Sequence, residues 1–385
     1  MQPAQTKRRA VGRLLRPGAQ RFRPPRVALP LGIFAASRLL TFAVYPLARL
    51  LPGGSHAFGR YFEFWDGNWY VQTAIQGYPP QLARPPQGSN HAFFPLYPLL
   101  IRFFHNLTGA SYQNVGLVIN LIGAAAGMMV IWALVERLLG AGAATRSVIL
   151  LSFFPWAFIF SFDYSEGLLL ALSAICLLAL VEEQWVIAGV AALLAGAERP
   201  DGFVLALPCA WAALVAVRRH RAWQAIVAPA LSPVGILAFF LFLRARTGDF
   251  LANLHARSTG WATAGMGVNL SSGLRYLRAY LHNPLSNVNF TGTLLSLALY
   301  ALALVLMVRW RPPAIIWLWT VPVVLLGIVF DTFASFPRFG LAAFPLMIAV
   351  ARPLKGPWFT VVAAASAAMM ALLFVVVGQT MFLTP

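Results

Sequence analysis

Long apolar runs separated by short polar turns restrict the folds open to this chain more than any other feature. Eleven such runs follow one another, and they cover residues 27–51, 112–135, 147–162, 167–181, 185–197, 203–217, 222–243, 290–308, 313–330, 339–350 and 358–382. Hydrophobic residues make up 59% of the 385 residues and charged residues only 10%, against roughly 25% in soluble domains. A soluble fold could not bury this much apolar surface, and strand-like alternation is missing, so helices are the expected spanning elements. The sequence therefore predicts an all-α polytopic membrane protein with about eleven transmembrane helices.

The basic residues indicate which way the chain crosses the membrane. The net charge is +18, but the basic residues lie in short clusters between apolar runs, which favours positive cytoplasmic loops over nucleic-acid binding. Residues 1–26 hold eight basic residues between Lys7 and Arg26, and no acid, so we expect a disordered cytoplasmic tail that contacts anionic membrane lipids. Residues 27–385 are expected to form a single transmembrane domain in the cell membrane, with the N-terminus in the cytoplasm.

Two stretches are expected on the outer side of the membrane. Residues 52–111 form a first outer loop, in which the run 91–107 is short for a span of about 20 residues and is expected to lie partly in the interface as a helix. Residues 244–289 form a long outer loop. This topology places eight of the eleven acids outside: Glu63, Asp66, Asp163, Glu166, Glu198, Asp201, Asp249 and Asp331. Acids at the edge of so apolar a protein are candidates for function, although for any one of them other than Asp66 a solvated helix end is the simpler reading.

The first outer loop holds the strongest candidate for chemistry. Two carboxylates, Glu63 and Asp66, stand there among aromatic residues. A carboxylate in this place could take the proton from an acceptor hydroxyl while that oxygen attacks the anomeric carbon of a sugar. Sugar nucleotides are not expected outside the cell, so the donor would be a lipid-linked sugar, whose phosphate leaving group needs cationic donors. Four arginines on the same side could supply them: Arg199, Arg244, Arg257 and Arg338.

Five segments in order resemble the motifs of the PIG-V family, which contains the eukaryotic GPI mannosyltransferase II and bacterial relatives. They are residues 64–70 (FWDGNWY) with 77–78, 93–98 (FFPLYP), 163–166 (DYSE), 198–202 (ERPDG) and 336–339 (FPRF). The resemblance implies a GT-C glycosyltransferase bundle with its catalytic acid in the first outer loop, an inverting mechanism and a polyprenyl-phosphate sugar donor, most often of mannose. It assigns the acid to Asp66. The GPI acceptor does not carry over, because the Arg-rich, Lys-poor composition suggests a GC-rich bacterium.

Asp66 is thus the predicted catalytic base, and eight further residues are predicted to contact substrate: Glu63, Trp65, His91, Tyr164, Glu166, Arg199, Asp201 and Arg338. Plainer readings stay open. Asp66 could cap a turn beside Gly67, Glu63 could pair with Arg60, and His91 could be a hydrogen-bonded loop residue. Tyr164 and Glu166 could mark a helix start that favours an acid, and Trp65 could belong to an aromatic belt. Asp201 could serve only as the partner of Arg199, and Arg338 could snorkel at the membrane edge.

Other functional classes remain as alternatives. A transporter or flippase of lipid-linked sugars would place ionisable groups near the bilayer midplane, whereas here only Arg38 lies well inside a span. A non-catalytic subunit that holds a partner enzyme is a third reading. Beyond the lipid-linked donor, no cofactor is expected with certainty. Glu63 and Asp66 could hold a hydrated divalent cation, but no cluster has the spacing of metal ligands. The acceptor and any protein partners are not specified by the sequence.

Overall fold

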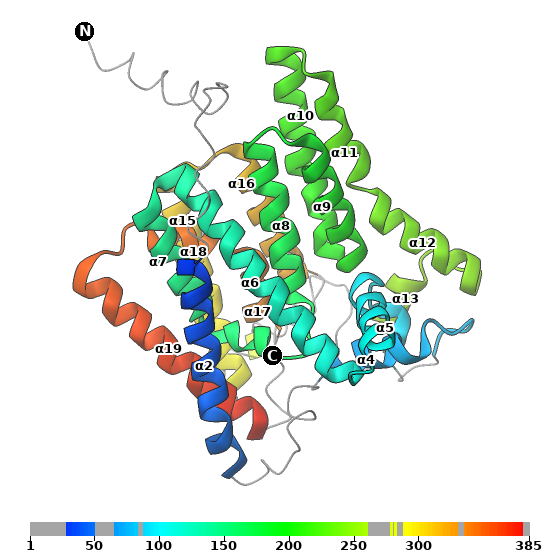
Figure 1. The fold of residues 1–385 in the computed structure, drawn as a ribbon, viewed down its shortest axis with the longest axis horizontal. Coiled ribbons are helices and arrows are strands. Elements are labelled where there is room, and N and C mark those ends of the chain that lie inside the picture. The colour runs from blue at the N-terminus through cyan, green and yellow to red at the C-terminus, as the bar shows by residue number, and fades with distance from the viewer. Residues whose placement is uncertain are drawn as a thin grey trace.

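The computed structural model shows an all-helical bundle (Figure 1). It describes residues 28–50, 65–83, 88–260, 278–279, 281–282, 288–329 and 335–379. The predicted basic tail at 1–26, Glu63 and residues 261–277 of the predicted long outer loop lie outside these ranges. In the described residues the α-helices are α2 Ala28–Leu50, α4 Asp66–Gln76, α5 Leu96–Thr108, α6 Tyr112–Leu139, α7 Ala141–Ser152, α8 Glu166–Val181, α9 Trp185–Glu198, α10 Ala206–His220, α11 Val227–Leu231, α12 Val234–Thr247, α13 Ala252–Gly260, α15 Val288–Trp310, α16 Ala314–Val329, α17 Phe336–Ala342, α18 Pro345–Ala351 and α19 Gly356–Gln379. Short 3₁₀ helices connect some of them: η1 Asn90–Ala92, η2 Pro155–Ser161, η3 Pro200–Leu205 and η4 Trp223–Ile226.

Helices α6 and α8 form the centre of the bundle and pack with their backbones almost in contact. A Cβ atom added to Gly167 would lie 2.2 Å from the Asn120 carbonyl oxygen, and one added to Gly123 would lie 2.8 Å from the Leu168 nitrogen. Small residues at such crossings let membrane helices approach closely, which replaces the hydrophobic drive that lipid does not supply. The two glycines therefore fix where α8 begins relative to α6.

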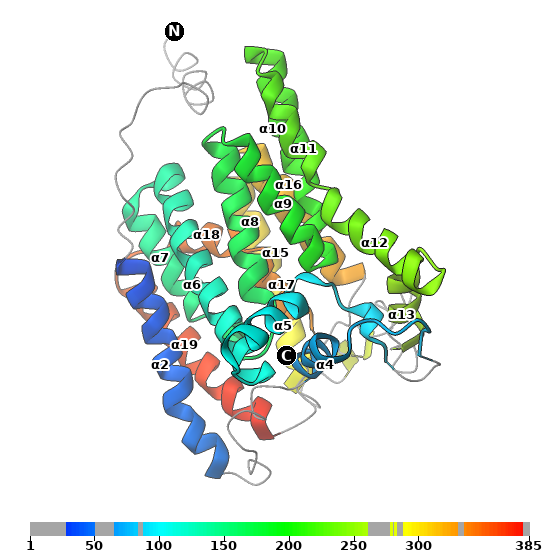
Figure 2. The ribbon, with the colours of Figure 1, turned by 45° about the vertical axis from the view of Figure 1, so that its right-hand side comes forward.

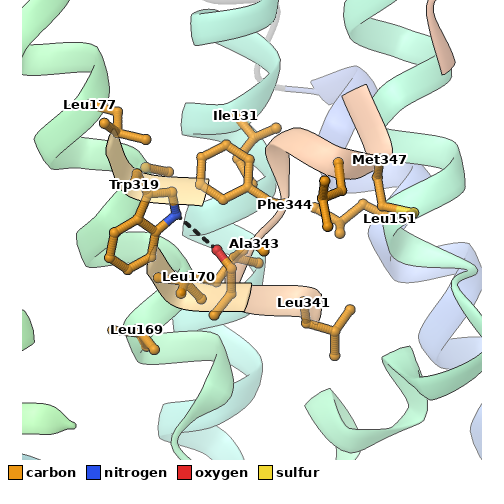
Figure 3. Close-up of a cluster of buried hydrophobic side chains, with 14 of the residues drawn as sticks. Ile131, Leu151, Leu169, Leu170, Leu177, Trp319, Leu341, Ala343, Phe344 and Met347 are labelled. Carbon is orange, nitrogen blue, oxygen red and sulfur yellow. Dashed lines mark hydrogen bonds between the residues drawn. The ribbon is translucent and has the colours of Figure 1, made fainter. Parts of the chain in front are cut away.

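The second half of the chain closes over this centre through the short helix α17. The indole Nε1 of Trp319 in α16 donates to the Ala342 carbonyl at 2.9 Å, within a buried apolar cluster that includes Leu170 and Phe344 (Figure 3). The Tyr300 hydroxyl of α15 donates to the Pro337 carbonyl at 2.5 Å. A Cβ at Gly340 would overlap the Tyr300 hydroxyl at 1.7 Å, so this glycine leaves the room that the tyrosine needs. Helices α15 and α16 thus hold α17 from two sides.

A buried arginine in α2 binds the backbone where a span is broken. Helices α7 and η2 meet at a bend of 75°, and the break frees carbonyl groups from their helical partners. The Arg38 guanidinium donates to the Ser152 carbonyl at 3.2 Å, to the Ala157 carbonyl at 2.8 Å and to the Ser161 hydroxyl at 2.9 Å. A charge inside a span is expensive unless such partners surround it. These contacts give Arg38 a structural role at this break.

One end of the bundle carries three helices that are not candidate spans. Helices α4, α5 and α13 lie together there (Figure 2). The Tyr70 ring of α4 lies edge-on to Phe93 at 5.1 Å and to Tyr97 at 5.0 Å. The predicted helix within the run 91–107 exists as α5, which begins at Leu96 after the turn η1. The long outer loop was expected to begin at residue 244, but α12 continues to Thr247 and residues 252–260 form the helix α13.

Within the described residues, six helices are long and apolar enough to cross a membrane, or seven if the bent pair of α7 and η2 is one span. Three shorter apolar helices, Glu166–Val181, Trp185–Glu198 and Ala314–Gly327, fall below the length limit. The expected polytopic all-α fold is therefore confirmed, while the count of eleven stays a prediction.

Candidate active site

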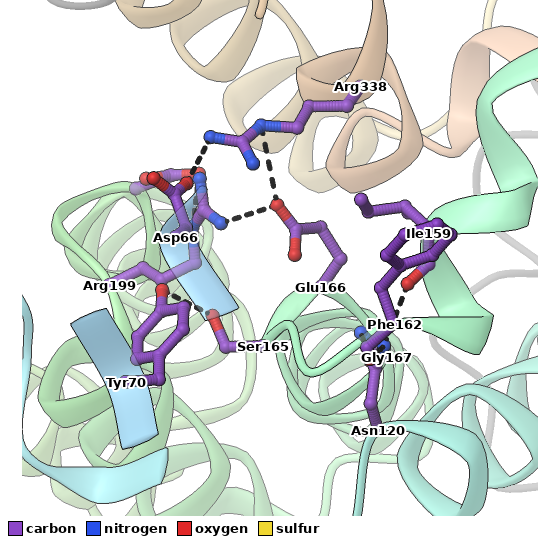
Figure 4. Close-up of polar contacts among 11 residues, drawn as sticks. Asp66, Tyr70, Asn120, Ile159, Phe162, Ser165, Glu166, Gly167, Arg199 and Arg338 are labelled. Carbon is purple, nitrogen blue, oxygen red and sulfur yellow. Dashed lines mark hydrogen bonds and ion pairs between the residues drawn. The ribbon is translucent and has the colours of Figure 1, made fainter. Parts of the chain in front are cut away.

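Four charged side chains from distant parts of the chain meet at the start of α8 (Figure 4). A nitrogen of Arg338 contacts the Asp66 carboxylate, and the Arg338 Nε lies 3.6 Å from Glu166 Oε1. The same Glu166 oxygen accepts from Arg199 Nη1 at 2.8 Å. Asp201 extends the chain of ion pairs, with its Oδ2 3.4 Å from Arg199 Nε. We call Asp66, Arg338, Glu166, Arg199 and Asp201 the ion-pair network.

Asp66 is the first residue of α4 and the most open member of the network. Its side chain is 26% exposed, whereas that of Arg338 is 7% exposed and that of Glu166 is 4% exposed. A carboxylate in the first turn of a helix is stabilised by the helix dipole. The preceding residue, Trp65, has φ 51°, a left-handed backbone conformation that is costly for a residue other than glycine. This turn directs the chain so that α4 begins with its carboxylate beside Arg338.

The two arginines, Arg199 and Arg338, are held by different contacts. Arg199 follows α9 directly and is bracketed by Glu166 and Asp201. Arg338 lies on α17, and its guanidinium also covers the ring of Tyr164 at 5.2 Å, a distance suited to a cation–π contact. The network thus pairs two guanidinium groups with three carboxylates, Asp66, Glu166 and Asp201. Buried charges of this kind are kept in the protein only when they are paired.

Asn120 of α6 holds the segment that presents Tyr164 and Glu166. Its side-chain amide nitrogen donates to the carbonyl groups of Ile159 and Phe162, each at 2.9 Å, and its amide oxygen accepts from the Gly167 nitrogen at 2.7 Å (Figure 4). The residue is fully buried. It therefore joins the end of η2 to the first turn of α8. Asn120 was not among the predicted site residues, although a lone polar side chain inside an apolar span is a signal that could have identified it.

A hydrogen bond also connects α4 to the start of α8. The Tyr70 hydroxyl lies 2.9 Å from the Ser165 hydroxyl, and both side chains are buried. Burial raises the pKa of Tyr70 above its usual value, so the hydroxyl stays protonated. Ser165 was not among the predicted contacts with substrate.

The remaining predicted contacts with substrate, His91, Trp65 and Glu63, are not members of the ion-pair network. His91 is buried, with its Nδ1 2.6 Å from the Ser89 hydroxyl and its Nε2 2.8 Å from the Pro79 carbonyl. Burial lowers its pKa. These contacts fit the reading of His91 as a hydrogen-bonded loop residue. Trp65 is exposed beside Asp66. Glu63 lies outside the described residues, so its pairing with Arg60 or with a cation stays a prediction.

The described residues do not form a cluster of metal ligands. Among them, no group of three or more His, Cys, Asp or Glu side chains is arranged to hold a metal ion. The carboxylates of the ion-pair network are instead each in contact with a guanidinium group. This arrangement can bind an anion through its arginines and can accept a proton at the exposed carboxylate.

Comparison with known proteins finds one partial family match and a similar fold. Residues 90–244, about two fifths of the chain, match a family model described as dolichyl-phosphate-mannose-protein mannosyltransferase. The apo crystal structure of the Archaeoglobus fulgidus oligosaccharyltransferase superposes with a TM-score of 0.52 at 12% identity, and the match covers 94% of this chain. The oligosaccharyltransferase AglB from the same organism, in complex with an inhibitory peptide and a dolichol-phosphate, gives a TM-score of 0.49 at 12% identity. No curated protein matches the chain.

These matches confirm part of the prediction. The chain has an all-helical membrane fold similar to that of the apo oligosaccharyltransferase, and its residues 90–244 match a mannosyltransferase family model. It spans 57% of the length of the apo oligosaccharyltransferase that it matches. The matched family is described by protein mannosylation, whereas the sequence motifs resembled the PIG-V family, so the PIG-V resemblance stays a prediction.

Proposed function

We propose that this chain transfers a sugar from a polyprenyl-phosphate donor to an acceptor outside the cytoplasm, with inversion at the anomeric carbon. The observation that carries the proposal is the contact of Asp66 with Arg338, and of both arginines with shared carboxylates, at one end of the bundle. A base and two cations in one cluster are what this reaction needs, because it deprotonates an alcohol and expels a phosphate. Mannose is the sugar that the matched family description and the PIG-V resemblance both favour.

Each member of the ion-pair network has one role in this reaction. The Asp66 carboxylate accepts the proton of the acceptor hydroxyl, and the acceptor oxygen forms its bond to the anomeric carbon. The bond between that carbon and the phosphate oxygen breaks, and its electron pair stays on the lipid phosphate. Arg338 and Arg199 stabilise the charge of that leaving phosphate, because guanidinium groups bind phosphate oxygens through two parallel hydrogen bonds. Glu166 and Asp201 hold the two arginines in place.

The arrangement of the helices supports an extracytoplasmic position for this network. Helix α10 ends in Arg218, Arg219 and His220, and this end lies opposite the end that carries α4 and α17 (Figure 1, Figure 2). Basic turns favour the cytoplasmic side, so the network would face outward. Cysteine labelling from outside intact cells should modify a cysteine placed at Trp65 and not one placed at Arg219. The reverse pattern would contradict the proposed topology.

Substitution of Asp66 tests the proposed function. Asp66→Asn keeps the shape of the side chain but cannot take a proton, so transfer from a labelled polyprenyl-phosphate sugar should fall on the order of 100- to 10,000-fold. Asp249→Asn is a matched control, because Asp249 is also an acid at this end and lies 2.6 Å from His255. Unchanged turnover in Asp66→Asn would remove Asp66 as the base. Movement of the labelled lipid across proteoliposomes without a new glycosidic bond would favour the flippase alternative.

A further inference from the structure

A second layer of contacts lies beside the ion-pair network and links the same elements. Ser165 precedes Glu166, Glu198 precedes Arg199, and Tyr70 lies one helical turn after Asp66. The Tyr70 hydroxyl lies 2.9 Å from the Ser165 hydroxyl, and the fully buried Glu198 carboxyl lies beside Ser165. Each residue of this layer is therefore rigidly tied through the backbone to one member of the network. We call Tyr70, Ser165 and Glu198 the supporting layer.

The ion pairs alone cannot fix the position of Asp66. Arg338 has a long side chain with many rotamers, so its guanidinium can follow the Asp66 carboxylate if α4 shifts. The contact between Tyr70 and Ser165 has little such freedom. The Tyr70 ring is packed edge-on against Phe93 and Tyr97, and the Ser165 side chain is short and fully buried. A shift of α4 would break this hydrogen bond in a place that water does not reach, which costs more than breaking it at the surface.

We infer that Tyr70 and Ser165 form a positioning pair, which sets where the Asp66 carboxylate stands relative to Glu166 and its two arginines. The inference rests on the proposed function, since it concerns the alignment of the proposed base. Tyr70 and Asp66 are four residues apart in α4 and share a face of the helix, so a hydrogen bond at Tyr70 fixes the rotation of the turn that carries Asp66. Catalytic groups need second contacts of this kind to hold their geometry.

The test removes the hydroxyl groups one at a time and together. Tyr70→Phe and Ser165→Ala should each lower kcat on the order of 10- to 100-fold, because a small displacement of a reacting group has this effect. The donor KM should stay within about twofold of wild type, since the arginines keep their carboxylate partners. The double variant should lose no more than either single variant, because both remove the same contact. If Tyr70→Phe does not fold, Ser165→Ala provides the test by itself.

Tyr97→Phe is the matched control. Tyr97 is a buried tyrosine of the neighbouring helix α5, and its hydroxyl donates to the Gly116 carbonyl at 2.8 Å, outside the ion-pair network. It should change the thermal unfolding midpoint about as much as Tyr70→Phe, with kcat within about twofold of wild type.

Three results would overturn the inference: wild-type kcat in Tyr70→Phe and Ser165→Ala, an equal loss of kcat in Tyr97→Phe, or a loss confined to the donor KM. The last is what a tyrosine that only binds substrate would give. Failure of the proposed function is distinguishable, because the wild-type protein itself would then transfer no sugar.

Discussion

Asp66 and Arg338 form an ion pair although 272 positions separate them in the sequence. The contact joins the first residue of α4 to the short helix α17, and Arg338 also approaches Glu166. If the arginine stabilises the leaving phosphate, Arg338→Gln should reduce the rate of transfer on the order of 100- to 1,000-fold, as loss of one preorganised donor does elsewhere. The measurement is the initial rate with a labelled polyprenyl-phosphate sugar in membranes.

Arg137→Gln serves as its control. Arg137 forms an ion pair with Glu182 at 2.9 Å, at the other end of the bundle, and both side chains are partly exposed. Exposed pairs of this kind contribute little to stability, so the variant should retain wild-type turnover. Equal losses in Arg137→Gln and Arg338→Gln would show that charge removal in general, rather than the place of Arg338, determines the rate.

A second prediction concerns Asn120 and the free energy of unfolding. Asn120→Ala leaves two carbonyl groups and one N–H group without their side-chain partner in a buried place. The free energy of unfolding should fall by about 3 kcal/mol, measured from unfolding in detergent. Asn114→Ala on the exposed face of the same helix should stay within about 0.5 kcal/mol of wild type. A similar stability for both variants would contradict the clamp that Asn120 forms.

A third prediction follows from the close approach of α6 and α8. In Gly167→Ala the new Cβ would lie 2.2 Å from the Asn120 carbonyl oxygen and 2.8 Å from the Ala124 nitrogen, and both of these are backbone atoms that cannot turn aside. The cost should be roughly 3 kcal/mol or more, at the upper end of the range for overpacking. Size-exclusion chromatography after extraction should show less monodisperse protein. Gly32→Ala in α2 meets nothing within 4 Å and should keep the wild-type profile.

A fourth prediction is a pH dependence of stability that arises from His91. Burial lowers the pKa of His91 below its usual 6.5, and its ring nitrogens lie beside Ser89 and the Pro79 carbonyl. Between the lowered pKa and 6.5 the unfolded chain binds a proton that the folded chain does not. This contribution to stability is therefore fully present above pH 6.5 and is lost as the pH falls below it. The thermal midpoint of the wild type should drop between pH 7.5 and pH 5 by more than that of His91→Gln. If the thermal midpoints of both proteins fell equally with pH, His91 would not be the origin of the pH dependence.

Much of the ion-pair network could be predicted from short motifs, but the residues that position it could not. Asp66, Glu166, Arg199, Asp201 and Arg338 stood out because charges are rare in so apolar a chain, and the structure places all five together. Their roles in catalysis and binding stay predictions. Tyr70 and Ser165 gave no comparable signal, because a tyrosine among aromatic residues and a serine before a helix are both ordinary. Their contact depends on how α4 lies against α8, which local sequence does not specify.

The helices, too, were predicted where local sequence specifies them and missed where distant contacts do. Apolar length predicted the long helices, since a span needs about 20 residues. Helix α13 was missed because it is short and polar, although Asp249 accepts from the Leu251 nitrogen at 2.9 Å at its start, and a Gly248-Asp249 pair is a usual mark of one helix ending and another beginning. The contacts at the bend between α7 and η2 are likewise distant in sequence, because Arg38 lies 114 positions before the Ser152 carbonyl that it binds.

The position of Arg338 late in the chain has a consequence for biogenesis. Synthesis proceeds from the N-terminus, so the segments bearing Asp66, Glu166 and Arg199 are made long before α17 exists. Until then, the growing chain holds acids that still await one of their two cations, in a medium where an unmatched charge is costly. The chain made before α17 is therefore an electrically unbalanced intermediate, and the synthesis of α17 supplies the cation that neutralises it.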